Sequence, residues 1–219
     1  MNKMINKDSS FFHLEYKPKL KNPIYIIGVS GVGNVGRVST QLLIEWSRAK
    51  FFSSFYSYYF LDQALIQNDG ICNLPKWDFY ESGFCYPNLI ICVGNSKIAV
   101  DESEAYYILL NKILDFGLKF KIKKLIIVDG VAALSNYVKD IYVTATSENL
   151  IKKLVNFGGK PLKTTELPGI IGVLLGLAKL KSLNGIGIIK PSKSLVLDRE
   201  AGESAFNFLV KALNLKRKM

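Results

Sequence analysis

The chain has 219 residues, of which 49% are hydrophobic and 21% charged, and its formal net charge is +11. This length and composition are typical of one globular domain with a substantial core, and they exclude a disordered chain. No apolar run is long enough to span a bilayer, and the first ten residues lack the apolar stretch of a signal peptide, so we expect a cytoplasmic protein.

Few residues of this sequence could carry metal or acid–base chemistry. Three cysteines form no C-x-x-C motif, and His13 is the single histidine. We therefore predict no disulfide framework, no metal site, no cofactor and no catalytic residues. The positive charge favours partners with acidic surfaces or nucleic acid. Because the lysines are scattered and no RNA-recognition or helix-turn-helix pattern is present, nucleic-acid binding is the weakest of these hypotheses.

Composition divides the chain into three parts. Residues 1–22 are polar and predict an N-terminal lead that a few aromatic side chains could anchor. Residues 23–215 alternate apolar runs with amphipathic segments and predict a single α/β domain. Residues 216–219 predict a short basic tail.

The domain opens with a glycine-rich turn between a strand and a helix. Ile24–Val29 is a short, β-branched apolar run, which predicts a buried strand, and Gly31, Gly33 and Gly36 follow with G-x-G-x-x-G spacing. Such a unit binds dinucleotides when an acidic residue ends the second strand. The expected second strand, 51–60, contains no acid. We therefore favour a tight turn that lets the helix pack closely on the sheet.

An aromatic excursion interrupts the strand–helix alternation. Asn68-Asp69-Gly70 lies between two short apolar segments and predicts a β-hairpin. The hairpin region would give the sheet an antiparallel part or an aromatic flap. Trp77, Phe79 and Tyr80 follow it, and they are candidates for a protein interface because aromatic residues are enriched in such patches. The alternative is a lid that packs on the domain's own core.

Strands and helices then alternate to the end of the domain. Strands are expected at 89–93, 125–128, 137–145 and 185–189, and helices after Asp101, after Ser147, at 168–179 and after Asp198. Gly169 and Gly172 recur about once per turn in the third of these helices, so we expect the first glycine loop, a neighbouring helix or another subunit to approach it closely. Together the elements predict a three-layer α/β/α domain with a mostly parallel sheet and one hairpin excursion.

In such a sheet a ligand lies beyond the carboxyl ends of the strands. The candidates for a ligand-binding or partner-binding loop there are Gly31, Val32, Gly33, Asn34, Gly36, Arg37, Asn95, Ser96, Gly169 and Gly172. They offer amide, hydroxyl and backbone N–H groups with one cation, which could hold an anion or reach a partner's carboxylate. No catalytic triad or carboxylate pair accompanies them, so we expect an anion-binding crevice or a non-catalytic scaffold.

Several motifs resemble one family along nearly the whole chain. The run Lys17 to Gly36, KPKLKNPIYIIGVSGVGNVG, is similar to the opening of the proteasome assembly chaperone family in its archaeal branch. Further similar motifs follow in order: N-D-G at 68–70, G-N-S at 94–96, L-D-F-G at 114–117, A-T-S-E-N-L at 145–150, the glycine-containing helix at 169–179 and D-R-E-A-G at 198–202.

The resemblance implies a phosphorylase-like α/β/α domain that binds protein. Family members self-associate or pair with a paralogue and assist assembly of the proteasome α-ring. Some relatives dock between proteasome α-subunits through a C-terminal hydrophobic-Tyr-any residue tail. This chain ends Arg217-Lys218-Met219 without that tyrosine, which argues against docking by the tail and leaves action through another partner open.

The leading hypothesis is thus a non-enzymatic, homo-oligomeric assembly factor. The alternative is a small-molecule or nucleotide-binding α/β enzyme that uses the glycine loop 31–36, since relatives have been labelled as ATP-grasp enzymes. Where relatives often have aspartate this chain has Asn95, and we find no magnesium-binding carboxylate set. Both departures weigh against the enzyme.

Overall fold

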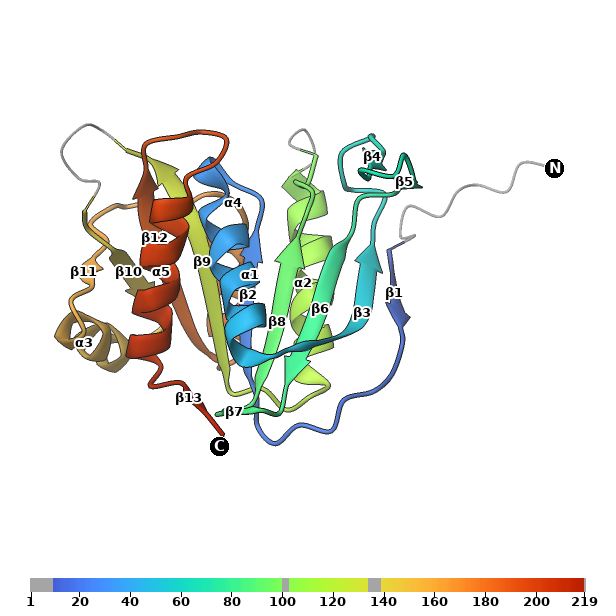
Figure 1. Cartoon of the computed structure of the whole chain (residues 1–219). Coiled ribbons are helices and arrows are strands. Elements are labelled where there is room, and N and C mark those ends of the chain that lie inside the picture. Colours follow the sequence, from blue (N-terminus) through green and yellow to red (C-terminus); the bar gives the residue numbers. More distant parts are fainter. Residues whose placement is uncertain (1–9, 100–102, 134–138, 219) are drawn as a thin grey trace.

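One nine-stranded sheet organises the chain, whose computed structural model describes residues 10–99, 103–133 and 139–218 (Figure 1). In sheet order the strands are β1 (Phe11–Leu14), β3 (Lys50–Tyr56), β6 (Trp77–Ser82), β8 (Leu89–Gly94), β2 (Ile24–Val29), β9 (Lys124–Ala132), β12 (Asn184–Ser192), β10 (Tyr142–Ala145) and β11 (Lys160–Pro161). Residues 1–9 of the predicted lead and Asp101 of the predicted helix cap lie outside the described ranges.

The centre of the sheet is parallel and its flanks are partly antiparallel. Strands β8, β2, β9 and β12 run parallel to one another. Strand β6 lies antiparallel between β3 and β8, β1 pairs antiparallel with β3, and β10 pairs antiparallel with β12. Asn68-Asp69-Gly70 forms the predicted hairpin turn, between β4 (Leu65–Ile66) and β5 (Cys72–Asn73).

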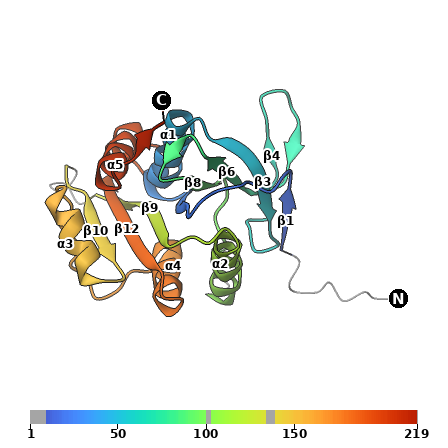
Figure 2. The same ribbon diagram turned by 90° about the horizontal axis from the view of Figure 1, so that it is seen from below.

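Helices cover both faces of this sheet, which confirms the predicted three-layer α/β/α class. Helices α1 (Val35–Ser47) and α5 (Arg199–Ala212) lie on one face, whereas α2 (Ser103–Leu118) and α4 (Gly169–Leu180) lie on the other (Figure 2). Helix α3 (Glu148–Asn156) lies beside the edge that β10 and β11 form. Residues of β2 alternate between the two cores, with Tyr25 and Ile27 in one and Ile26 in the other. Burial on both faces explains why this strand is apolar throughout.

Residues near both ends of the described chain form short strands that pair with the folded unit. Strand β1 forms one edge of the sheet. The ring of Phe12 packs on the rings of Phe55 and Phe116, with centroid distances of 4.6 and 4.1 Å. At the other end, β13 (Lys216–Arg217) pairs with β7 (Cys85–Tyr86). Strands of two to four residues leave too short a pattern to recognise in the sequence.

The expected interface at Trp77 and Phe79 is wrong, because both side chains are fully buried. They lie in β6, and the strand is covered by β3 and β8 along its edges and by α2 on one face. The indole N–H of Trp77 donates to the carbonyl of Ser96 at 3.0 Å. Tyr80 points to the other face and is half-buried. For Trp77 and Phe79, packing on the domain's own core is therefore the correct alternative.

Within the described ranges, none of the helices combines the length and the apolar character that a membrane span requires.

Candidate functional site

The glycine loop 31–36 leaves the carboxyl end of β2, passes through the short 3₁₀ turn η1 (Val32–Asn34) and enters α1 (Figure 1). Gly33 has a φ of 62°, and a Cβ there would collide with the hydroxyl oxygen of Ser192. A Cβ at Gly36 would collide with the carbonyl of Val128, in β9. These glycines let α1 lie directly on the sheet, as the simpler interpretation of the motif predicts.

Three backbone amides of this loop, those of Gly33, Asn34 and Val35, donate to carbonyls of the protein itself. Gly33 N–H donates to the carbonyl of Leu195 at 3.2 Å, and Asn34 N–H donates to the carbonyl of Gly31 at 3.1 Å. The Val35 amide donates to Val32. Dinucleotide sites instead turn such amides toward a pyrophosphate. The loop is thus built as a packed junction.

The segment 192–198, which connects β12 to α5, packs on the glycine loop through hydrogen bonds. The side-chain amide of Asn34 donates to the carbonyl of Val196 at 2.7 Å, and Asp198 N–H donates to the carbonyl of Gly33 at 2.9 Å. The carboxylate of Asp198 accepts from the Ala201 amide, which makes it the predicted cap of α5. Its other oxygen accepts from Ser192 Oγ and the Lys193 amide, both at 2.9 Å.

The Asp198 carboxyl is held in its charged form by these bonds. Burial acts to raise the pKa of Asp198, but the hydrogen bonds from Ala201, Lys193 and Ser192 outweigh it and hold the pKa below its ordinary value. Both the N-terminal cap of α5 and the position of the 192–198 segment therefore depend on one ionised side chain.

Asp129, which directly follows the expected strand 125–128, lies next to the predicted loop. It follows the buried residues 125–128 of β9, and a Cβ at Gly31 would lie 2.6 Å from its Oδ1. Burial raises its pKa to about 6, although the Gly130 amide donates to Oδ1 at 2.7 Å. Its place at a strand end was the available signal in the sequence.

The other predicted residues have structural partners. Asn95 exchanges hydrogen bonds with the backbone of Lys76, which ties the end of β8 to the start of β6. Ser96 is buried and accepts from Trp77 through its carbonyl. Within the described ranges, neither residue forms a hydrogen bond with the glycine loop 31–36.

Gly169 and Gly172 lie on α4, on the face of the sheet opposite α1 (Figure 2). A Cβ at Gly169 would meet nothing within 4 Å in the described chain. A Cβ at Gly172 would collide with the carbonyl of Leu167, so the close approach expected there comes from the loop before the same helix. The structure does not bring these two glycines to the loop 31–36.

An exposed apolar segment accompanies the loop instead. Leu195, Val196 and Leu197 are 72%, 76% and 47% exposed. Beside them a groove of 580 Å³ runs between α1 and α5, and Arg37 and Arg199 contribute to its walls. Exposed apolar side chains next to arginines are typical of protein-binding surfaces. In the described ranges no cluster of three or more His, Cys, Asp and Glu residues could hold a metal ion.

Comparison with known proteins gives concordant matches. The model of the PAC2 family matches residues 25–218. An uncharacterized protein of Methanocaldococcus jannaschii, MJ1210, is 27% identical over 205 residues, which cover 91% of this chain and 77% of that protein. Pyrococcus furiosus PbaB, described as an archaeal proteasome activator, has a TM-score of 0.85 at 25% identity, covering 95% of this chain and 91% of PbaB. Pyrococcus furiosus PbaA, an archaeal homolog of proteasome-assembly chaperone, has a TM-score of 0.75 at 23% identity, with 95% and 88% covered.

Proposed function

This chain belongs to the PAC2 family, and on that premise we propose that it is a non-enzymatic assembly factor that binds other protein chains. It acts as a homo-oligomer or with a paralogue, in the cytoplasm, and proteasome α-subunits are its partners. The similarity to PbaB over nearly the full length of both chains supports this proposal.

One observation carries the non-enzymatic part of the proposal. The Gly33, Asn34 and Val35 amides, which a nucleotide phosphate would need, donate instead to carbonyls of the same chain. A phosphate would have to displace the 192–198 segment and break its hydrogen bonds to the loop before it could bind there.

The partner-binding surface is then the outer side of this junction. We define it as Leu195, Val196 and Leu197 together with Arg37. Burial of such apolar side chains drives association, and an arginine beside them can pair with a partner's carboxylate. The glycine loop supports this surface from beneath and needs no ligand.

Co-expression with the proteasome α-subunit of the same organism, followed by native mass spectrometry, tests the proposal. The expected result is a stable complex that Val196→Asp abolishes. Leu180→Asp provides the matched control, because Leu180 is 83% exposed on α4, on the other face of the sheet. A complex that both variants retain would overturn the placement of the surface, and a wild-type chain that ignores the α-subunit would overturn the choice of partner.

A small-molecule or nucleotide-binding enzyme is the second candidate, and Asp129 is the observation in its favour. A carboxyl group with its pKa raised to about 6 at the carboxyl ends of parallel strands is typical of functional sites. Thermal unfolding against a panel of nucleotides and phosphates tests it, since a ligand at 100 times its Kd stabilises by about 2.7 kcal/mol. If no member of the panel shifts the unfolding temperature, the enzyme is excluded and the assembly factor is the remaining candidate.

A further inference from the structure

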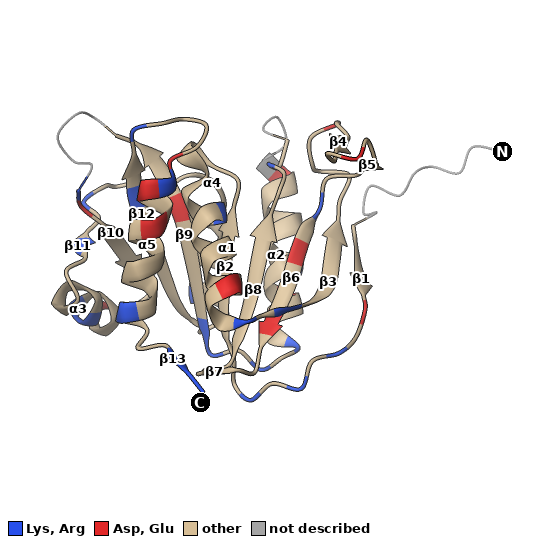
Figure 3. Ribbon diagram, viewed as in Figure 1, with Lys and Arg blue, Asp and Glu red and all other residues tan. Residues whose placement is uncertain are grey.

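Acidic side chains concentrate in one part of this basic protein. The stretch 51–111 contains two cations, Lys76 and Lys97, whereas the whole chain has a net charge of +11. Seven carboxylates lie in the same stretch: Asp62, Asp69, Asp78, Glu81, Asp101, Glu102 and Glu104. Figure 3 shows acidic residues around the β4–β5 hairpin and on β6, and basic residues on α3 and β11. The two edges of the sheet therefore differ in charge.

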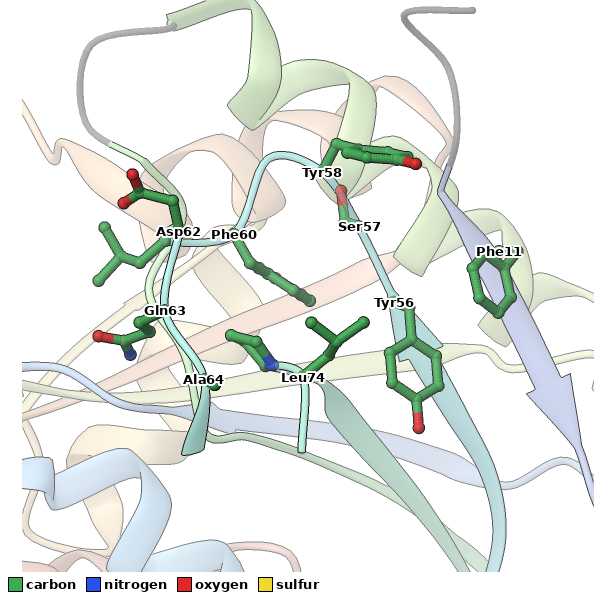
Figure 4. Close-up of a pocket in the computed structure, with 11 residues that line it drawn as sticks. Phe11, Tyr56, Ser57, Tyr58, Phe60, Asp62, Gln63, Ala64 and Leu74 are labelled. Atoms are coloured by element: carbon green, nitrogen blue, oxygen red, sulfur yellow. The ribbon is translucent and has the colours of Figure 1, made fainter. Parts of the chain in front are cut away.

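The acidic edge carries an aromatic groove of 520 Å³ (Figure 4). Phe11, Tyr56 and Tyr58 line one side of it, and Phe60 and Leu74 lie between them and Asp62 (Figure 4). We call these six residues the aromatic groove.

The groove is unusually apolar for an exposed surface. Phe11, Tyr58 and Leu74 are 58%, 70% and 67% exposed, and the Phe11 and Tyr56 rings stack with their centroids 5.3 Å apart. Ile66 of the neighbouring hairpin is 66% exposed. Exposed apolar side chains gathered in this way are typical of a site of association.

Asp62 places a negative charge at one side of the groove. It is exposed, and in the described ranges its carboxylate forms no ion pair with a lysine or arginine. An occupant that suits the groove therefore combines an apolar or aromatic side chain with a nearby cation.

The opposite edge of the same sheet presents this combination. Strand β11 ends the sheet there, with α3 packed beside it. Phe157, at the C-terminal end of α3, is 37% exposed and Val155 is 41% exposed. Lys153 lies one turn before Phe157 and therefore on the same side of the helix. We call Lys153 and Phe157 the α3 surface.

Unlike the nearby Lys152 and Lys160, Lys153 can pair with a carboxylate of another molecule. Lys152 pairs with Glu148 at 2.8 Å, and Lys160 pairs with Asp140 at 2.8 Å. In the described part of the chain Lys153 is exposed and forms no such ion pair.

We propose that the aromatic groove binds the α3 surface of a second copy of this chain, with Phe157 in the groove and Lys153 paired with Asp62. The contact gives a structural basis to the self-association that the proposed function includes, and it rests on that part of it. Because the two surfaces differ and lie at opposite edges of one sheet, the contact is head-to-tail. Repetition of it generates a ring if the rotation closes and an open chain if it does not.

A charge-swap experiment on the full-length chain tests this contact. Sedimentation velocity over a concentration series measures the self-association of the wild type, Asp62→Lys, Lys153→Asp and the double variant. Each single variant should weaken the association by about tenfold or more, because it places like charges together. The double variant should recover most of the loss, which a general effect of either change would not produce.

Glu166→Lys is the matched control for Asp62→Lys. Glu166 is exposed, lies in the loop before α4, and forms neither the groove nor the α3 surface. The Glu166→Lys variant should self-associate as strongly as the wild type. Circular dichroism melting curves of all variants should agree, since both exchanged side chains are exposed.

The outcomes separate this contact from the broader proposal. Self-association that ignores all three variants would overturn the groove–α3 contact and leave self-association standing. A wild type that stays monomeric at every concentration would overturn the self-association as well. Binding to the proteasome α-subunit is measured separately, so its success or failure decides neither of these results.

Discussion

At the residue scale, two helical glycines have opposite environments. The backbone of α1 touches the sheet at Gly36, where a Cβ would collide with the Val128 carbonyl. In α4, a Cβ at Gly176 would meet nothing within 4 Å. Glycine is thus required at the first position and costs helix stability at the second.

Gly36→Ala should therefore lower the free energy of unfolding by about 1–3 kcal/mol, because the added methyl group must push α1 away from β9. Gly176→Ala should instead raise it by about 1 kcal/mol, since alanine is the better helix former. Urea unfolding of both variants checks the pair. Equal effects from the two substitutions would contradict the packing role of the glycine loop.

Asp129 makes stability depend on pH in a defined direction. Its folded pKa of about 6 exceeds the ordinary value of 3.8 for an aspartate, so the folded protein binds a proton more tightly than the unfolded chain. Above pH 6 the ionised carboxylate destabilises the fold, and this penalty fades as the pH falls toward 4.

Asp129→Asn should consequently raise stability at pH 7.5 by an amount on the order of 2 kcal/mol and have little effect near pH 4. Chemical unfolding of wild type and variant across this range provides the measurement. A variant that is less stable at pH 7.5 would mean that the ionised carboxylate has a stabilising partner.

At the element scale, β1 shows how a short edge strand is held. Adjacent phenylalanines point to opposite sides, because side chains alternate along a strand. Phe12 contacts Phe55, Phe79 and Phe116, whereas Phe11 is 58% exposed and contacts Tyr56. The aromatic core beneath β3 and β6 thus fixes the strand through one ring.

Phe12→Ala should destabilise the protein by about 2–3 kcal/mol, somewhat less than a fully buried ring would. Phe11→Ala, one residue earlier, should change stability by about 0.5 kcal/mol or less. Guanidinium unfolding of the two variants measures both effects. A similar loss from both would indicate that pairing with β3, rather than the Phe12 ring, holds the strand.

The same elements show what sequence patterns could predict. Strands β2, β8, β9 and β12 are apolar runs buried on both faces, so local pattern predicts them, and Asp198 is recognisable as a helix cap. The position of β6 between β3 and β8 depends on pairings that no local pattern encodes.

The candidate site was harder to predict for the same reason. The glycines of the loop are visible in the sequence, but their partners lie about 160 residues away, where Asn34 bonds to Val196. Only the fold reveals that the Gly33, Asn34 and Val35 amides are bonded within the chain. The aromatic spacing of Trp77 and Phe79 likewise suits a surface and a core equally well, and the strands on either side decide for the core.

At the scale of the whole molecule, the charge distribution predicts how assembly responds to salt. The acidic edge around Asp62 and the basic edge at α3 attract each other between copies, while the excess of +11 opposes close approach of copies elsewhere. Raising the salt from about 0.1 M to about 1 M shortens the Debye length from about 10 Å to about 3 Å.

Self-association of the wild type should therefore weaken by about twofold to fivefold over this range of salt, because the exposed pair of Asp62 and Lys153 is screened. The Asp62→Lys variant should show the opposite trend, since salt then screens a repulsion. Sedimentation at the two salt concentrations distinguishes the cases. Wild-type association that strengthens with salt would indicate a contact that is mainly apolar, held by the groove aromatics and Phe157 without the charge pair.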